Sequence, residues 1–186
     1  LITIYGIASG MSYLHSHNIL HPILNPKNIR IDSQYHPHLS EIGFYIRPEN
    51  SKTILRTTMK TKDDNILYLS PEKLKSTDNV TEKSDVYSYS LVVYEIITKK
   101  TPFDKNIETS EIIMKIVNDK YRPEIPETIP KFYKEMIERC LSYDPKDRPS
   151  FSEIVSQLEN EPSIITTEID REEYLRYQTF LKQNQK

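Results

Sequence analysis

The sequence predicts a mainly α-helical fold that contains one small β-hairpin. Apolar residues recur at helical spacing over residues 4–14 and 84–98, and the second stretch is apolar almost all round, as in a buried helix. Residues 29–31 and 39–41 instead read as two short strands, joined by the polar turn 32–37. With 186 residues, the chain is long enough for one domain with its own core.

The first helix is expected over residues 4–14, before the polar turn at 15–18. After the hairpin, residues 44–67 are polar and show no strong periodicity, so we expect a loop there. One face of the first helix is expected to be buried and consists of Ile4, Ile7, Ala8, Met11 and Leu14.

Three further helices are expected in the second half of the main unit. One opens near 109 and runs to 117, and Pro130 can start the next. Ser150 and Glu153 have the spacing of a capping box and predict a helix that ends near Leu158. The helix after Pro130 is expected to point inward with Phe132, Met136, Ile137 and Cys140.

The pattern changes after Pro162, and a separate helix is expected near the C-terminus. Asp170 and Glu173 again have capping-box spacing. The positions that follow at helical spacing are Tyr174, Tyr177 and Leu181. We therefore divide the chain into a main unit, 1–160, and a C-terminal helical tail, 161–186. The tail either packs back on the main unit or binds a partner, and we favour packing.

Composition excludes several classes of function. The net charge of −2 gives no electrostatic reason to bind nucleic acid or an acidic membrane. No apolar run approaches the roughly 20 residues that span a bilayer. The single cysteine, Cys140, excludes an internal disulfide and suits a reducing, cytoplasmic location, with the thiol buried as a small hydrophobe. No cysteine cluster accompanies the five histidines, so we expect no metal site built on them.

Several segments, taken in order, resemble the signatures of eukaryotic protein kinases. Residues 21–28 read His-Pro-Ile-Leu-Asn-Pro-Lys-Asn and resemble the catalytic loop, His-Arg-Asp-Leu-Lys-Pro-x-Asn. Residues 39–44 stand in the place of the Asp-Phe-Gly motif, and Ser-Pro-Glu at 70–72 resembles Ala-Pro-Glu. The stretches 84–95 and 140–151 resemble the long central helix and the late helix-loop-helix of the kinase C-lobe.

The resemblance covers roughly residues 1–160 and implies a protein-kinase-like C-lobe, of the serine/threonine or tyrosine-kinase-like group. Family kinases also carry a glycine-rich phosphate loop in an N-terminal lobe. The chain has only three glycines, Gly6, Gly10 and Gly43, and contains no such loop. It begins at Leu1 without methionine, so we expect an excerpt of a longer protein or a truncated product of an α+β kinase fold.

The catalytic loop departs from the family pattern at the positions that carry the chemistry. Ile23 replaces the aspartate that accepts the proton of the substrate hydroxyl, and isoleucine has no lone pair. Asn25 replaces the lysine that neutralises the transferring phosphoryl group. Pro22 replaces the arginine that grips a phosphorylated activation loop. The resemblance therefore implies that no catalytic residue is intact.

Two positions keep oxygen ligands suited to Mg-ATP. Asn28 matches the asparagine that holds one magnesium ion, and Glu41 matches the aspartate that holds magnesium between the phosphates. A glutamate carboxylate still ligates magnesium, but its extra methylene displaces the ion or demands another rotamer. We expect binding of Mg-ATP to be weak, altered or absent.

The positions with an architectural role in the family are retained. Asp85 matches the helix aspartate that binds the backbone of the catalytic loop. Glu72 and Arg148 match a buried ion pair, and His21 and Gly43 stand at two further architectural points. A retained scaffold with lost catalytic charges is typical of a pseudokinase.

Three hypotheses for function follow. We favour a catalytically impaired kinase-like domain that acts as a scaffold or allosteric binding module for protein partners. The alternative is a fragment of a divergent serine/threonine protein kinase that transfers the ATP γ-phosphate to protein hydroxyls with the help of Glu41 and Asn28. The third hypothesis is a degraded gene product without a selected function.

Overall fold

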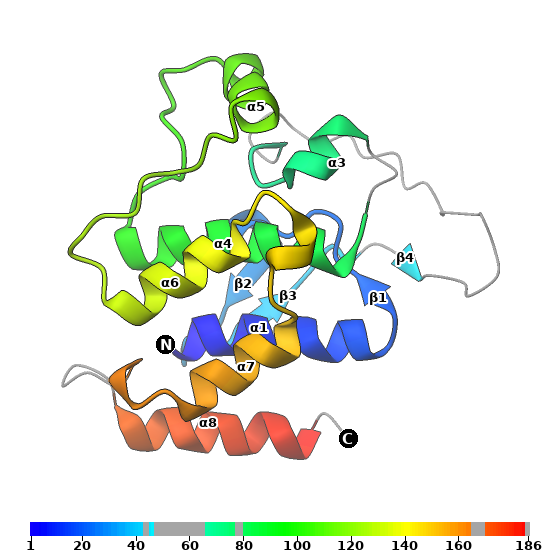
Figure 1. The fold of residues 1–186 in the computed structure, drawn as a ribbon. Helices are drawn as coiled ribbons and strands as arrows, with labels where there is room; N and C mark the ends of the chain where they lie inside the picture. Colours follow the sequence, from blue (N-terminus) through cyan, green and yellow to red (C-terminus); the bar gives the residue numbers. More distant parts are fainter. Residues whose placement is uncertain (43–44, 47–65, 77–79, 165–169, 185–186) are drawn as a thin grey trace.

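The computed structural model describes residues 1–42, 45–46, 66–76, 80–164 and 170–184. These residues form mainly α-helices with two small antiparallel sheets of two strands each (Figure 1). The fold class that the sequence predicts is therefore confirmed. Among the same residues, no helix combines the length and the apolar character that crossing a bilayer requires.

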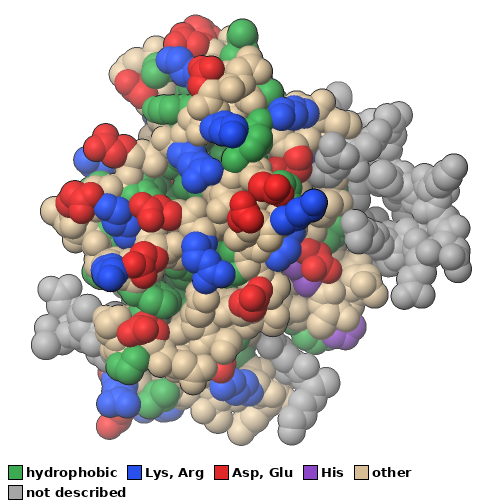
Figure 2. Space-filling view, viewed as in Figure 1, with side chains coloured by type: hydrophobic (Ala, Val, Ile, Leu, Met, Phe, Trp, Pro, Cys, Tyr) green, Lys and Arg blue, Asp and Glu red, His purple; other side chains and the backbone are tan. Residues whose placement is uncertain are grey.

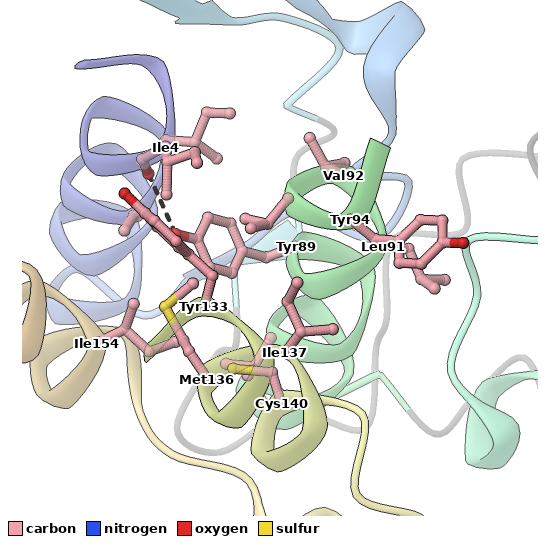
Figure 3. Close-up of a cluster of buried hydrophobic side chains, with 14 of the residues drawn as sticks. Ile4, Tyr89, Leu91, Val92, Tyr94, Tyr133, Met136, Ile137, Cys140 and Ile154 are labelled. Atoms are coloured by element: carbon pink, nitrogen blue, oxygen red, sulfur yellow. Dashed lines mark hydrogen bonds between the residues drawn. The ribbon is translucent and has the colours of Figure 1, made fainter. Parts of the chain in front are cut away.

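Helix α4 (Glu82–Thr98) lies at the centre of the molecule, with α1 (Ile2–Ser16) and α6 (Lys131–Cys140) packed against it (Figure 1). Figure 3 shows side chains of the three helices, among them Ile4, Tyr89 and Met136, pointing toward one another. The buried phenol of Tyr89 donates a hydrogen bond of 3.1 Å to the carbonyl oxygen of Ile4, which lies 85 residues earlier. The hydroxyl thus ties α4 to α1 inside an otherwise apolar core.

Two helices of the core begin at capping boxes. The predicted box of Ser150 and Glu153 opens α7 (Phe151–Asn160), and both of its reciprocal hydrogen bonds are present, so this prediction is confirmed. A second box, between Thr81 and Ser84, opens α4. The sequence analysis missed this one because serine, rather than the usual glutamate or glutamine, supplies the returning side chain.

Helices α3 (Pro71–Lys75) and α5 (Thr109–Asn118) pack together on the opposite side of α4 from α1 (Figure 1). The 3-10 turn η2 (Pro145–Asp147) joins α6 to α7 and contacts α4. The predicted helix over residues 109–117 is confirmed, whereas α3 is too short to show a helical period in the sequence.

The prediction for the inward face of α6 omitted one position. Phe132 is partly buried and packs against the core, and Tyr133 is also buried in the core, together with Met136. The buried positions 133, 136, 137 and 140 follow the helical period, which places position 132 at the edge of that face. Pro130 is the residue before the helix rather than its first residue.

The hairpin forms, but its second strand is shifted from the prediction. Strand β2 (Ile29–Ile31) pairs with β3 (Pro37–Leu39), so the predicted strand over 39–41 was wrong. The carboxylate of Asp32 accepts hydrogen bonds of 2.9 Å from the backbone N–H groups of Gln34 and His36. These bonds close the turn early, so the strand starts at Pro37.

A second pair of strands forms next to the predicted catalytic loop. Strand β1 (Ile19–Leu20) runs antiparallel to β4 (Tyr45–Ile46), and the 3-10 turn η1 (Pro26–Asn28) forms the last part of the loop. Strands of two residues have no period that a sequence can reveal. The loop over 21–28 is thereby held at one end by β1 and at the other by η1 and β2.

The C-terminal tail packs back on the main unit. After the 3-10 turn η3 (Pro162–Ile164), helix α8 (Arg171–Asn184) lies along α1 (Figure 1). The buried Tyr174 donates a hydrogen bond of 2.8 Å to the carbonyl oxygen of Leu158, and its ring meets that of Tyr5 edge-on. Aromatic packing and this hydrogen bond therefore hold α8 in place.

We expect Gly6→Ala to loosen the tail. A methyl group at Gly6 would lie 2.5 Å from the Tyr177 hydroxyl and 2.6 Å from the ring of Pro37, so α8 or the hairpin must move. Overpacking of this kind typically costs about 1–3 kcal/mol. Hydrogen exchange of the α8 amides would report the loss.

The matched control is Gly10→Ala in the same helix. A methyl group at Gly10 would approach the side chain of Leu39 at 3.3 Å, a contact that a small shift of the leucine relieves. Alanine also favours helix by about 0.5–1 kcal/mol over glycine. Equal α8 protection in the two variants would show that the close approach at Gly6 does not limit docking of the tail.

Candidate functional site

The predicted catalytic loop is anchored to α4 through one carboxylate. Asp85 Oδ2 accepts a hydrogen bond of 2.8 Å from the backbone N–H of His21, and it lies 2.9 Å from His15 Nε2. All these groups are largely or fully buried. The first turn of α4 thus fixes the position of the loop, 64 residues earlier in the chain.

The side chain of His21 joins this anchor to the end of the hairpin. Its Nε2 lies 3.1 Å from the carbonyl oxygen of Ser40, which requires Nε2 to carry the proton. Burial lowers the pKa of His21, although the nearby charge of Asp85 opposes the shift. The imidazole is therefore neutral near pH 7 and acts as a structural link.

At the positions that differ from the kinase pattern, Asn25 and the backbone of Ile23 form hydrogen bonds within the loop. Ile23 presents a hydrocarbon side chain, and its carbonyl oxygen accepts hydrogen bonds from the side-chain amides of Asn25, at 2.7 Å, and Asn28, at 2.9 Å. Asn25 Oδ1 accepts a third bond, of 2.9 Å, from the backbone N–H of Lys27. Asn25 is 1% exposed, and both of its polar atoms hold the loop in shape.

Ser40 links the backbone segments that carry the two predicted magnesium ligands, Asn28 and Glu41. Asn28 is mostly buried, and its carbonyl oxygen accepts hydrogen bonds from the N–H and the hydroxyl of Ser40, at 2.9 and 3.0 Å. Glu41 follows directly, is exposed, and has a φ of 56°, in the left-handed region. A non-glycine residue in this region is strained, which marks a position that the surrounding structure imposes.

Glu72 and Arg148 form a bidentate ion pair between α3 and the segment that follows η2. The guanidinium lies 2.7 and 2.9 Å from the two carboxylate oxygens and is 1% exposed. Burial alone would raise the pKa of Glu72, but the hydrogen bonds and charge of Arg148 outweigh it, so the pKa of this carboxyl is lowered. The pair connects residues 76 positions apart.

Lys73 was not singled out in the sequence analysis, and it is buried and interacts electrostatically with Asp85 and Glu72. Its side chain is 3% exposed. Burial lowers its pKa to about 8, against the opposing attraction of Asp85 and Glu72. A lysine in a short polar segment carries no sequence signal of burial, because lysine is almost always exposed.

A groove of about 420 Å³ borders the catalytic loop at Asn25 and Lys27. Its far side is formed by α5 and the segment between α4 and α5. Apolar surface comes from Leu67, Phe103, Ile107 and Ile112. Glu95, which accepts a hydrogen bond from the Tyr68 hydroxyl, adds a carboxylate. The groove thus combines apolar and charged surface next to the loop.

Three further predictions concern Cys140, a metal site and Gly43. Cys140 is fully buried, and burial raises its pKa to about 12, which confirms the small-hydrophobe interpretation. Among the described parts of the chain, no group of three or more His, Cys, Asp or Glu side chains has an arrangement that holds a metal ion. Gly43 lies outside the described residues.

The loop, its anchor on α4 and the ion pair together follow the kinase pattern in order and in space. The family model for the protein tyrosine and serine/threonine kinases matches residues 1–158. The chain belongs to the protein kinase family. The resemblance identified from the motifs is thereby confirmed.

Individual kinases show the same relationship. This kinase domain is 34% identical over 155 residues to the probable serine/threonine-protein kinase drkC of Dictyostelium discoideum. It is 36% identical over 156 residues to the dual specificity protein kinase pyk3 of the same organism. It is 32% identical over 166 residues to the receptor-interacting serine/threonine-protein kinase 4 of Mus musculus.

The aligned segments cover most of this chain but little of these relatives. They take up 82%, 84% and 84% of the chain, and 20%, 11% and 21% of drkC, pyk3 and the mouse kinase. The similarity is therefore to one part of each kinase.

Proposed function

We propose that this kinase domain is catalytically impaired and acts as a scaffold or allosteric binding module for protein partners. One observation carries the proposal. The loop keeps its anchors to Asp85 and Ser40, while a hydrocarbon side chain, Ile23, stands at the position of the proton acceptor. Loss of a general base typically lowers a rate by about 10²–10⁴-fold.

The missing cation supports the same conclusion. Asn25 carries no charge, and its amide is already committed to Ile23 and Lys27. It therefore offers nothing to a transferring phosphoryl group, whose developing charge must be stabilised electrostatically. The two losses together reduce transfer by more than either alone, although such effects are not additive.

The side-chain oxygen atoms of Glu41 and Asn28 fit a residual Mg-ATP site. The carboxylate of Glu41 is exposed, and Asn28 uses its amide N–H on Ile23 and keeps Oδ1 as an acceptor. Magnesium prefers oxygen ligands of these kinds and, when bound, would shield the charge of the phosphates. In our proposal these residues hold the nucleotide weakly, and binding rather than turnover is the retained function.

The groove beside the loop supports a protein partner. It combines apolar surface from Phe103 and Ile112 with the carboxylate of Glu95, a mixture suited to a polypeptide segment. The near balance of charge gives no matching case for nucleic acid. The single, buried thiol of Cys140 suits the reducing conditions of the cytoplasm.

The decisive experiment measures transfer of labelled phosphate from Mg-ATP by the longest native polypeptide that contains this chain. We expect no transfer above background from protein that shows a cooperative thermal unfolding transition. The control is Glu41→Ala. Efficient transfer that disappears in the control would establish the alternative, a divergent serine/threonine kinase. Protein without a cooperative transition would favour a degraded gene product.

A further inference from the structure

Two lysines from different elements converge on Tyr143, which lies between α6 and η2. Lys75, at the end of α3, donates a hydrogen bond of 2.7 Å to the Tyr143 hydroxyl. Its Nζ lies 5.0 Å from the centre of the tyrosine ring, and Lys120 Nζ lies 5.2 Å from the same point. Two positive charges thus share one half-buried aromatic ring.

Acidic side chains do not neutralise this pair. Within the described parts of the chain, neither Lys75 nor Lys120 forms an ion pair. Glu72, on the same helix as Lys75, is bound to Arg148. Asp144, next to Tyr143, accepts a hydrogen bond from the backbone of η2. Among the described residues, neither ammonium group therefore has a carboxylate partner at ion-pair distance.

The backbone at Lys120 adds an independent observation. Its φ is 55°, in the left-handed region that favours glycine. The preceding and following residues both donate hydrogen bonds to the carbonyl oxygen of Lys115, at 2.9 and 3.1 Å, which closes the end of α5. Glycine would form this turn with less strain. The position instead carries a cation, and the turn places it beside Tyr143.

The small number of basic groups near Tyr143 indicates which kind of ligand would fit. Figure 2 shows basic side chains near α3 and α5, but acidic side chains surround them, and the chain as a whole is slightly negative. A membrane surface or a nucleic acid needs a broad basic face. The Tyr143 hydroxyl donates its proton to the carbonyl oxygen of Val117, at 2.8 Å, so the lysines are the donors of this cluster. Two ammonium groups instead suit one compact anion with several acceptor oxygens, as a phosphate monoester has.

We propose that Lys75 and Lys120, which the ring of Tyr143 holds on one part of the surface, form a binding site for the phosphate group of a phosphorylated protein segment. The site lies where α3, the end of α5 and Tyr143 come together, so it is separate from the catalytic loop. It does not depend on whether that loop transfers phosphate. A purely structural role, in which the lysines only stabilise the carbonyl end of α5, makes the opposite predictions below.

The test titrates the longest native polypeptide with a pool of phosphoserine peptides and with the same pool unphosphorylated. Amide signals of Lys120, Tyr121 and Tyr143 should shift with the phosphorylated pool. Lys120→Gly should weaken this binding about tenfold or more, because charged contacts to phosphate are the strong ones. Its melting temperature should be unchanged or higher, since glycine relieves the left-handed strain. Lys75→Met should weaken binding similarly.

The matched control is Lys99→Gly. Lys99 is also an exposed lysine at a helix end, with a φ of 58°, but it lies at the end of α4. It should lose no affinity for phosphopeptide. Equal affinity of Lys120→Gly and Lys99→Gly would overturn the proposal, as would equal binding of the unphosphorylated pool. Binding to phosphatidylserine vesicles without binding to phosphopeptide would also overturn it, in favour of a membrane surface.

Discussion

Arg148→Met should lower the free energy of unfolding by about 3–5 kcal/mol, the usual cost of removing one partner of a buried ion pair. The guanidinium donates to both oxygens of Glu72 and to the carbonyl oxygens of Ser142, Lys83 and Tyr143, at 2.7–3.2 Å. Methionine would remove the guanidinium from all of these acceptors, and Glu72 Oε1 would keep its hydrogen bond from the Ser84 hydroxyl. Urea unfolding followed by circular dichroism would measure the loss.

The control is Arg139→Met, an exposed arginine of α6 that should change stability by less than about 0.5 kcal/mol. The Glu72→Met, Arg148→Met double variant should lose less than the sum of the two single variants, because the two residues are directly coupled. A loss below about 1 kcal/mol for Arg148→Met would show that the pair does not hold α3 in place.

The same ion pair should make stability sensitive to acid. The pKa of Glu72 is lower in the folded chain than its ordinary 4.5. The stabilisation is therefore fully present above about pH 4.5 and is lost as the pH falls through the folded-state pKa. Arg148→Met should lack this part of the acid dependence.

Lys73→Met should raise the free energy of unfolding at pH 7 by up to about 3 kcal/mol. The pKa of Lys73 falls from its ordinary 10.5 to about 8 on folding, and each unit corresponds to about 1.4 kcal/mol. At pH 7 the folded protein carries a buried ammonium, which methionine of similar length would replace without a charge. Asp85 keeps its hydrogen bond from the His21 backbone.

The gain in the free energy of unfolding from Lys73→Met should decrease as the pH rises. Below about pH 8 the lysine is protonated in both states, so the folded state bears the full cost of burying the charge. Between about 8 and 10.5 the unfolded chain binds more protons than the folded chain, so the stability of the unsubstituted protein rises with pH. The difference between the protein and Lys73→Met should therefore shrink across this window.

Unfolding curves at pH 7 and pH 10 would measure the free energy of unfolding of each variant at the two pH values. Taking the difference between variants removes the contribution of the buried tyrosines, whose pKa values burial raises. Lys100→Met, at an exposed lysine, is the control and should give a difference near zero at both pH values. A constant gain for Lys73→Met would show that its effect is packing rather than charge.

The sequence analysis succeeded where the information is local. The period of residues 84–98 predicted the central helix, and the spacing of Ser150 and Glu153 predicted the start of α7. Capping boxes and helical periods depend on side chains within one or two turns of each other. The order of the motifs identified the kinase family for the same reason, since each motif is a short, continuous segment.

It failed where a contact between distant residues, or a detail of one turn, decides the outcome. The hydrogen bonds of Asp32 place the start of β3 at Pro37. On α6, the sequence analysis missed the burial of Tyr133, which lies one position after the partly buried Phe132. The burial of Lys73 had no sequence signal, because composition places lysine on the surface.

By itself, the sequence determined the kinase fold class and which residue types stand at the motif positions, since folding cannot change the identity of a side chain. Only the tertiary structure decided how the remaining groups are used. It brought Glu72 to Arg148, and it brought both Lys75 and Lys120 to the ring of Tyr143. Such ion pairs and cation–π contacts depend on packing between elements far apart in the chain.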